Sequence, residues 1–126
     1  MILDASAVLA FLLREPGHER VTEVLLTAPR MSTVNLAEVV TKYVLRGAAA
    51  QGERLCHELP VLFDPVDEEL AFQAALMAAV TRPLGLSLGD RICLALARRT
   101  GLPALTADRS WLDVAGRLGV TVEAIR

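Results

Sequence analysis

Four acidic residues, Asp4, Glu38, Asp90 and Asp108, stand where the sequence predicts that a strand or turn passes into a helix. A parallel α/β sheet would gather carboxylates that are this far apart in sequence, because it places the starts of its crossover helices along one edge. Gathered carboxylate oxygens suit Mg²⁺ or Mn²⁺, which prefer hard oxygen ligands. An ion held in this way is suited to the hydrolysis of phosphodiester bonds.

Each of these acids also has a purely structural explanation. Asp4 could cap the first helix, the segments Asn35–Glu38 and Ser87–Asp90 resemble capping boxes, and Asp108 could form an Asx-type turn. Any one of the four is explained well enough in this way. The set is harder to explain, because acids at the start of buried helices need a cation nearby and the sequence offers no run of Lys or His. A divalent ion accounts for all four.

Two hydroxyl residues flank the candidate acids, with Ser6 two positions after Asp4 and Thr106 two positions before Asp108. They could orient a carboxylate or a reacting water molecule from behind the ligands. A serine at the start of a helix and a threonine in a strand explain them equally well.

Three charged residues near the candidate acids are weaker candidates. Arg91 and Arg109 each follow a candidate ligand directly and could contact a substrate phosphate, although a salt bridge facing solvent is equally compatible with their positions. Asp113 is a candidate fifth carboxylate, at a helical position that we expect to be solvated.

The composition bounds the class of protein. A length of 126 residues predicts a single domain spanning residues 1–126. The hydrophobic content of 53% and the mean hydropathy of +0.43 predict a strongly buried sheet or a sizeable subunit interface. No apolar run reaches the roughly 18 residues of a membrane span, and no secretory signal is visible, so a cytoplasmic location is expected.

The charge and the cysteines add little to this picture. A net charge of −2 does not mark a nucleic-acid-binding protein, yet it does not exclude a nuclease, because a bound metal ion offsets part of the local negative field. Cys56 and Cys93 are isolated, with no ligand spacing, and are expected to be buried thiols. The sequence has no phosphate-binding GxxxxGK[ST] loop, no GxGxxG and no GxSxG motif.

Short apolar strands alternate with helices along the whole chain, which predicts a parallel sheet with helices on both faces. The strands are expected at Met1–Leu3, Arg30–Thr33, Val61–Phe63, Ala104–Thr106 and Val120–Val122. The helices are expected at Ala5–Leu13, His18–Leu26, Leu36–Leu45, Ala48–Glu58, Asp67–Val80, Leu88–Thr100 and Ser110–Leu118, with a loop over Arg82–Gly89.

Four segments carry a resemblance to a known family: ILDASAVLAFLLREPG, NLAEV, LSLGDRICLALA and LTADRSW. Together they resemble the PIN-domain ribonucleases and, more narrowly, the VapC-type toxins of toxin–antitoxin systems. The resemblance spans nearly the whole chain. None of the segments is specific alone, but their order and spacing are quite specific jointly.

The resemblance implies a three-layer α/β/α fold around a short parallel sheet. It also implies an Mg²⁺- or Mn²⁺-dependent endoribonuclease, a homodimer, and inhibition by a VapB-type antitoxin. The family's acidic positions match Asp4, Glu38, Asp90 and Asp108, and its small hydroxyl positions match Ser6 and Thr106.

The expected reaction is hydrolysis of an RNA phosphodiester. Asp4, Asp90 and Asp108 would hold the metal, and Glu38 would complete the site or help to deprotonate the attacking water. The alternative is a non-catalytic module of the same fold that binds RNA or an antitoxin through helices in Ala5–Leu26 and Leu36–Glu58.

Overall fold

The computed structural model describes residues 1–126 and contains a five-stranded, wholly parallel sheet with the strand order β3-β2-β1-β4-β5. The strands are β1 (Ile2–Leu3), β2 (Arg30–Ser32), β3 (Leu62–Asp64), β4 (Ala104–Thr106) and β5 (Val122–Ala124). The register pairs Ile2 with Arg30 on one side and with Ala104 on the other. The strands are only two or three residues long, so the sheet is short.

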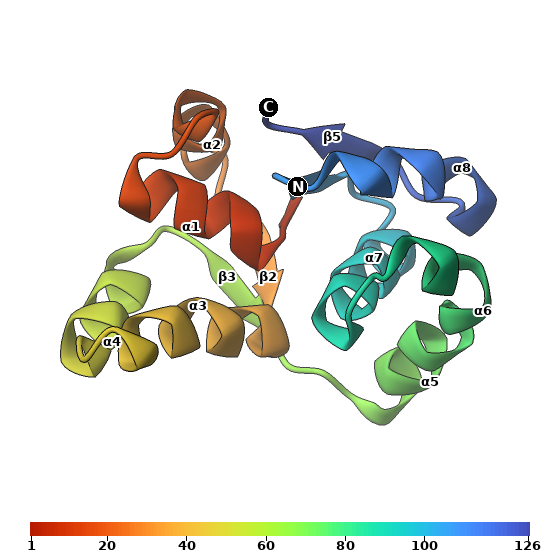
Figure 1. Cartoon of the computed structure of the whole chain (residues 1–126), viewed down its shortest axis with the longest axis horizontal. Helices are drawn as coiled ribbons and strands as arrows, with labels where there is room; N and C mark the ends of the chain where they lie inside the picture. Colours follow the sequence, from red (N-terminus) through yellow and green to blue (C-terminus); the bar gives the residue numbers. More distant parts are fainter.

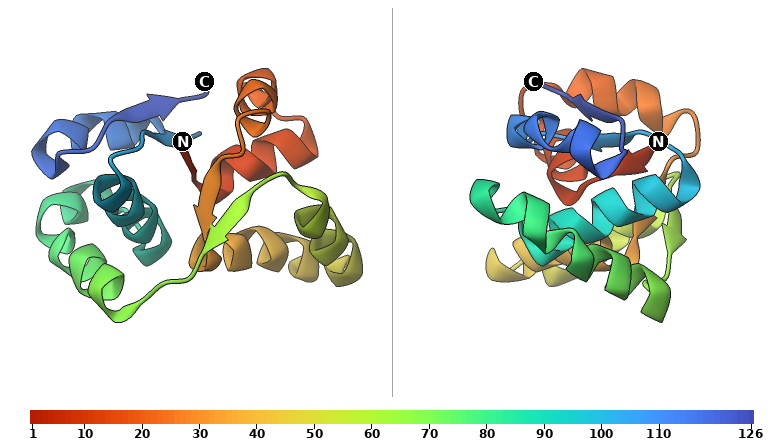
Figure 2. Two further views of the ribbon diagram at one scale, coloured as in Figure 1. Left: turned by 180° about the vertical axis from the view of Figure 1, so that it is seen from behind. Right: turned by 90° about the vertical axis from the view of Figure 1, so that its right-hand side faces the viewer.

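Helices cover both faces of the sheet. They are α1 (Ala5–Leu13), α2 (His18–Leu25), α3 (Thr33–Leu45), α4 (Ala49–Glu58), α5 (Glu68–Leu76), α6 (Ala78–Thr81), α7 (Leu88–Thr100) and α8 (Ala115–Leu118), with 3₁₀ turns η1 (Arg82–Leu84) and η2 (Arg109–Asp113). Helices α1–α4 lie on one side of the molecule and α5–α8 on the other (Figure 1). The same division is visible from behind (Figure 2). This confirms the predicted three-layer α/β/α arrangement.

Each layer of helices closes a separate hydrophobic core against the sheet. Alternate residues of a strand point to opposite faces, so Ile2 packs with α5 and α7 while Leu3 packs with α1, α2 and α3. In β4, Ala104 and Leu105 divide in the same way. The two central strands are therefore buried on both sides, as expected for a parallel sheet.

Most elements lie within a residue or two of the predicted positions, and three differ in kind. The predicted helix Asp67–Val80 is divided at Met77, a buried residue that keeps helical dihedral angles, and no proline or glycine marks the division. The predicted helix Ser110–Leu118 begins as the 3₁₀ turn η2 and becomes helical only in α8. The loop predicted before α7 contains the 3₁₀ turn η1.

The carboxyl ends of β1 and β4 meet at the centre of the sheet, where the strand order changes direction. The connections from β1 lead away to β2 and β3, and the next strand, β4, returns to the other side of β1. Ligands of open parallel sheets bind at such a switch point. None of the helices combines the length and the apolar character that a membrane crossing requires.

Candidate active site

Asp4 lies directly after β1, and only 3% of it is exposed. It occupies the N-cap position of α1, but its side chain makes no capping hydrogen bond, so the structural explanation of this residue is wrong. Its Oδ2 instead accepts hydrogen bonds from Ser6 Oγ at 2.6 Å and from Thr106 Oγ1 at 3.1 Å. Burial raises the pKa of Asp4 from 3.8 to about 6, the charges of Asp90 and Glu38 add to the rise, and the two hydroxyls oppose it.

The two hydroxyl residues link β1 to β4. Ser6 Oγ and Thr106 Oγ1 lie 3.2 Å apart. Each also accepts a backbone hydrogen bond, Ser6 from the amide of Ala107 at 2.9 Å and Thr106 from the amide of Asp108 at 3.1 Å. These amides fix the hydroxyl oxygens, which leaves the hydroxyl protons to point at Asp4. Ser6 and Thr106 therefore orient this carboxylate.

Glu38 lies in the second turn of α3, which begins three residues earlier than predicted. The helix is capped by Ser32, whose Oγ accepts from the amide of Asn35 at 3.0 Å, so the predicted capping box Asn35–Glu38 is wrong. Asn35 is fully buried, and its Nδ2 donates to Glu38 Oε2 at 2.9 Å and to the carbonyl of Gly89 at 3.1 Å. Its own Oδ1 accepts from Ser32 Oγ at 2.6 Å. The side-chain amide of Asn35 thus links α3 to the start of α7.

Gly89 gives the Glu38 carboxylate its space. A Cβ atom at residue 89 would overlap both carboxylate oxygens of Glu38. The Glu38 carboxylate can therefore occupy its present place only with glycine at position 89, because any larger residue would displace it. Burial raises the pKa of Glu38, the charge of Asp90 adds to this, and the hydrogen bond from Asn35 opposes it.

Asp90 lies in the first turn of α7 and forms the predicted capping box with Ser87. Its Oδ2 accepts from the amide of Ser87 at 2.8 Å, and its own amide donates to Ser87 Oγ at 3.2 Å. Burial raises the pKa of Asp90 and the charge of Asp108 adds to the rise, whereas the bonds to Ser87 and the charge of Arg91 oppose it.

Asp108 follows β4 by two residues and is exposed. Its Oδ1 accepts from the amide of Ser110 at 2.9 Å, which is the predicted Asx-type turn and begins η2. For Asp90 and Asp108, then, the capping roles are real. They engage one oxygen of each side chain and leave the other for a ligand.

All four carboxylates share this arrangement. One oxygen of each accepts a hydrogen bond that fixes the side chain: Oδ2 of Asp4, Oε2 of Glu38, Oδ2 of Asp90 and Oδ1 of Asp108. The other oxygen of each has no hydrogen-bond partner, and none of the four forms a salt bridge. The site therefore presents four carboxylate oxygens that could bind a ligand and that no donor of the protein occupies.

The charges of the four acids act on one another across four elements of the fold: α1, α3, α7 and η2. Asp90 raises the pKa of both Asp4 and Glu38, and Asp108 raises that of Asp90. No three His, Cys, Asp or Glu side chains lie close enough together to hold an ion on their own. The all-oxygen donor set and the absence of a cationic partner fit Mg²⁺ or Mn²⁺, and Mg²⁺ needs few direct protein ligands because it keeps several waters.

The weaker candidates lie at the margin of this cluster. Arg91 is half-buried and donates to the carbonyl of Ala74 at 3.2 Å, and the exposed Arg109 donates to the carbonyl of Arg126 at 3.2 Å. Neither arginine forms the salt bridge that was the alternative explanation. Asp113 is exposed at the end of η2, makes no side-chain hydrogen bond, and is not among the charges that shift the pKa of Asp4, Glu38 or Asp90.

Sequence reasoning missed three residues that position the site: Ser32, Asn35 and Gly89. A signal for the first was present, since Ser32 precedes Asn35 by the three residues that separate a cap from its backbone donor. The contact between Gly89 and Glu38 joins residues 51 positions apart, and nothing local in the sequence encodes it.

A family model matches most of the chain. Residues 1–117 match the model of the PIN domain, so this chain belongs to the PIN domain family. Nuclease activity that depends on a divalent metal ion is general in this family. No curated protein sequence matches the chain.

Solved structures share the fold at low sequence identity. A toxin–antitoxin complex from Klebsiella pneumoniae has a chain that is 17% identical, with a TM-score of 0.74 over 99% of this chain and 97% of that one. DNA-bound VapBC from Salmonella typhimurium gives 14% identity and a TM-score of 0.76 over the same shares. FitAcB from Neisseria gonorrhoeae gives 22% and 0.71, over 98% of this chain and 96% of that one.

Proposed function

We propose that this protein is a metal-dependent endoribonuclease, the VapC-type toxin of a toxin–antitoxin pair, acting in the cytoplasm as a single domain. One observation carries the proposal: four carboxylates are each fixed through one oxygen and keep the other free, at the switch point of a parallel sheet. A buried carboxylate without a cationic partner, such as that of Asp4, reduces stability, which supports a cationic ligand at this site.

Asp4, Asp90 and Asp108 would hold one or two Mg²⁺ or Mn²⁺ ions, directly or through water. When bound, such an ion acidifies water and neutralises charge on the phosphoryl oxygens. Ser6 and Thr106 keep Asp4 aimed at the site. Glu38, held by Asn35, completes the ligand set or takes the proton of the attacking water.

Arg91 and Arg109 are proposed to contact phosphates of the RNA. Each has guanidinium donors left over after its one hydrogen bond to a carbonyl, and a guanidinium presents five donors in a fork that matches phosphate oxygens. They flank Asp90 and Asp108, so they bring positive charge to a cluster that otherwise repels RNA.

The test is to incubate total cellular RNA with the protein in Mg²⁺, in Mn²⁺ and in EDTA, and to map the cut sites. Metal-dependent fragments that disappear with Asp4→Asn support the proposal. RNA that is bound but never cut, in either metal, would favour the non-catalytic binding module. Manganese binding is measured on the same samples by titration calorimetry, and no binding to the wild-type protein would contradict the metal site.

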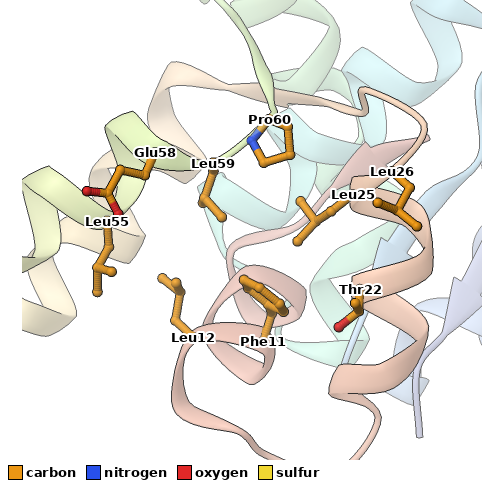
Figure 3. Close-up of a pocket in the computed structure, with 9 residues that line it drawn as sticks. All are labelled: Phe11, Leu12, Thr22, Leu25, Leu26, Leu55, Glu58, Leu59 and Pro60. Atoms are coloured by element: carbon orange, nitrogen blue, oxygen red, sulfur yellow. The ribbon is translucent and has the colours of Figure 1, made fainter.

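The proposed antitoxin site is an apolar groove between α1, α2 and α4 (Figure 3). Its volume is about 340 Å³, and its lining is Phe11, Leu12, Thr22, Leu25, Leu26, Leu55, Glu58, Leu59 and Pro60. A groove of this kind suits the apolar face of an amphipathic helix. The solved complexes in the comparison contain an antitoxin beside a chain of this fold, which is why we assign the groove to an antitoxin rather than to RNA.

Two exposed leucines provide a matched test of the groove. Leu26 lines it and is 85% exposed, whereas Leu45 is 81% exposed at the end of α3 and does not line it. Leu26→Arg should abolish neutralisation by a co-expressed antitoxin while RNA cleavage persists, and Leu45→Arg should leave neutralisation intact. Equal neutralisation of both variants would remove the groove from the proposal.

We also propose a homodimer. Helix α5 exposes Phe72 (63%) and Leu76 (70%), one helical turn apart on the same face, and apolar side chains in such a pair favour a protein partner. Light scattering should give twice the mass of the chain for the wild type and a monomer for Phe72→Glu. A monomeric wild type would contradict this part of the proposal.

A further inference from the structure

A second cavity, of about 230 Å³, lies between the segment formed by α6 and η1 and the first turn of α7. Its lining consists of Ala78, Thr81, Arg82, Gly85, Leu86 and Arg91. No acidic residue lines it, and two of its six residues are arginines. It lies beside the candidate active site, because Arg91 directly follows Asp90 in the same helical turn.

Arg91 forms the wall of the cavity nearest to the carboxylates. Its only hydrogen bond, from Nη1 to the carbonyl of Ala74, fixes the side chain and uses one of five donors. Its charge also lowers the pKa of Asp90, so the field of this guanidinium extends over the acidic cluster.

Arg82 forms the other cationic wall and has no hydrogen-bond or ion-pair partner. Arg20, Arg30 and Arg99 each bind a carboxylate, whereas Arg82 keeps all of its guanidinium donors, and it is the arginine without a partner that lines this cavity beside Arg91. The backbone of Arg82 is nevertheless fixed, because η1 contains a proline in its first turn and ends at Gly85, which has a φ of 68°. The amide of Gly85 donates a hydrogen bond to the carbonyl of Arg82 at 3.0 Å.

The remaining polar group of the cavity is already satisfied. Thr81 is fully buried, and its hydroxyl donates to the carbonyl of Met77 at 3.0 Å. The donors left for a ligand are therefore guanidinium groups, which select anions and match phosphate oxygens in particular.

We propose that this cavity binds a backbone phosphate of the RNA strand next to the phosphate that is cleaved, with Arg82 and Arg91 as the donors. This subsite rests on the proposed ribonuclease function. It solves a problem of that function, because a chain of net charge −2 with four free carboxylates must attract a polyanion to its acidic cluster. A cationic cavity on one side of the acidic cluster would hold the RNA strand there without placing a positive side chain where the metal ion is proposed to bind.

The test uses Arg82→Ala, with Arg46→Ala as the matched control, since Arg46 is also exposed and unpaired but lies at the end of α3. Binding of a fluorescein-labelled, single-stranded RNA is measured in Ca²⁺ over a series of salt concentrations. Arg82→Ala should weaken binding about tenfold. The slope of log affinity against log salt should fall by about 0.7, the value for one phosphate contact on a single strand. Arg82→Lys should keep most of the slope and lose part of the affinity.

Cleavage kinetics supply a second measurement. Arg82→Ala should raise KM with little change in kcat, and the affinity for Mn²⁺ and the melting temperature should equal those of the wild type. RNA affinity and salt slope unchanged by Arg82→Ala, or equally changed by Arg46→Ala, would overturn the subsite while the wild-type protein still cuts RNA. A wild-type protein that neither binds nor cuts RNA would instead overturn the proposed function, and the subsite with it.

Discussion

The chain treats its acidic residues in two different ways. Outside the candidate site, Asp67 and Glu123 bind cationic side chains: Asp67 accepts from the amide of Leu70 and from Arg99, and Glu123 accepts from Arg20. These contacts lower the pKa of both side chains. None of the four acids of the candidate site forms a salt bridge, and the pKa of Asp4 rises to about 6, whereas Asp64 at the end of β3 is paired with Arg30. The chain contains 13 basic residues, so the lack of pairing among these four acids is not a shortage of cations.

The difference between paired and unpaired acids shows which part of the fold lowers the stability of the folded state. Paired acids outside the site contribute a little to the folded state. Asp4 in its charged form opposes folding, because it is buried without a cationic partner near the charges of Asp90 and Glu38. Natural proteins accept such a loss at functional sites. The predictions below test this division between the paired and the unpaired acids.

The largest effect is expected for Asp4→Asn, which should reduce RNA cleavage at least about thousandfold, because the contribution of a catalytic metal amounts to several kcal/mol. The variant keeps the size of the side chain and removes a buried charge, so its unfolding midpoint should rise. Cleavage assays and urea unfolding measure the two properties. The control is Asp113→Asn, an exposed acid on η2 that should alter neither. Loss of cleavage in the control would add Asp113 to the site.

The metal-free protein should lose stability as the pH rises. Folded Asp4 keeps its proton up to about pH 6, whereas the unfolded residue releases it near 3.8, so between these values the folded state carries the extra proton and a rise in pH favours unfolding. The contribution of this proton to the free energy of unfolding is fully present below pH 3.8 and is lost above pH 6, a difference of about 3 kcal/mol. Urea unfolding in EDTA, followed by the fluorescence of Trp111, measures it against Asp4→Asn. A wild type that tracks the variant across this window would contradict the raised pKa.

Gly89→Ala separates helix stability from site geometry. Alanine favours a helix by roughly 1 kcal/mol over glycine, but its Cβ would displace the Glu38 carboxylate. We expect cleavage and Mn²⁺ affinity to fall about 10- to 100-fold, the range for residues that support a metal ligand. Gly116→Ala in α8 is the matched control, because nothing lies within 4 Å of its added Cβ. Equal activity of the two variants would show that Glu38 is not needed where it stands.

The smallest effect is expected at a paired acid. Glu123→Gln breaks the contact between β5 and Arg20 of α2, a partly exposed ion pair whose loss should cost less than about 1 kcal/mol. Cleavage and metal binding should be unchanged. A large loss of activity in this variant would show that the two groups of acids are not independent.

The sequence predicted the bounds of an element best where capping residues mark both of its ends. Helix α7 has its predicted bounds, because Ser87 begins it and Gly101 ends it with φ of 69°. Strand β5 begins two residues later than predicted, because its pairing with β4 starts with Val122 opposite Ala104, while the buried Val120 lies before the paired segment. Hydrophobicity alone located the apolar residues near the C-terminus but not the residues that pair with β4.

The candidate site could be predicted as a set of residues but not as a geometry. Asp4, Glu38, Asp90 and Asp108 are visible from their positions between elements. Which oxygen of each is engaged depends on long-range contacts, such as that of Thr106 with Asp4. The roles of Asn35 and Gly89 depend on the distance between two helices, which no local pattern determines.

The pairing of β1 with β4 also sets the order of events during synthesis. The amide of Asp4 donates to the carbonyl of Leu105 at 2.9 Å, so the first acidic residue acquires its final position only when a strand made about a hundred residues later docks beside it. Contacts between such distant segments form late in folding. A chain still emerging from the ribosome therefore has no assembled acidic cluster, and the candidate site can form only once translation has passed Asp108.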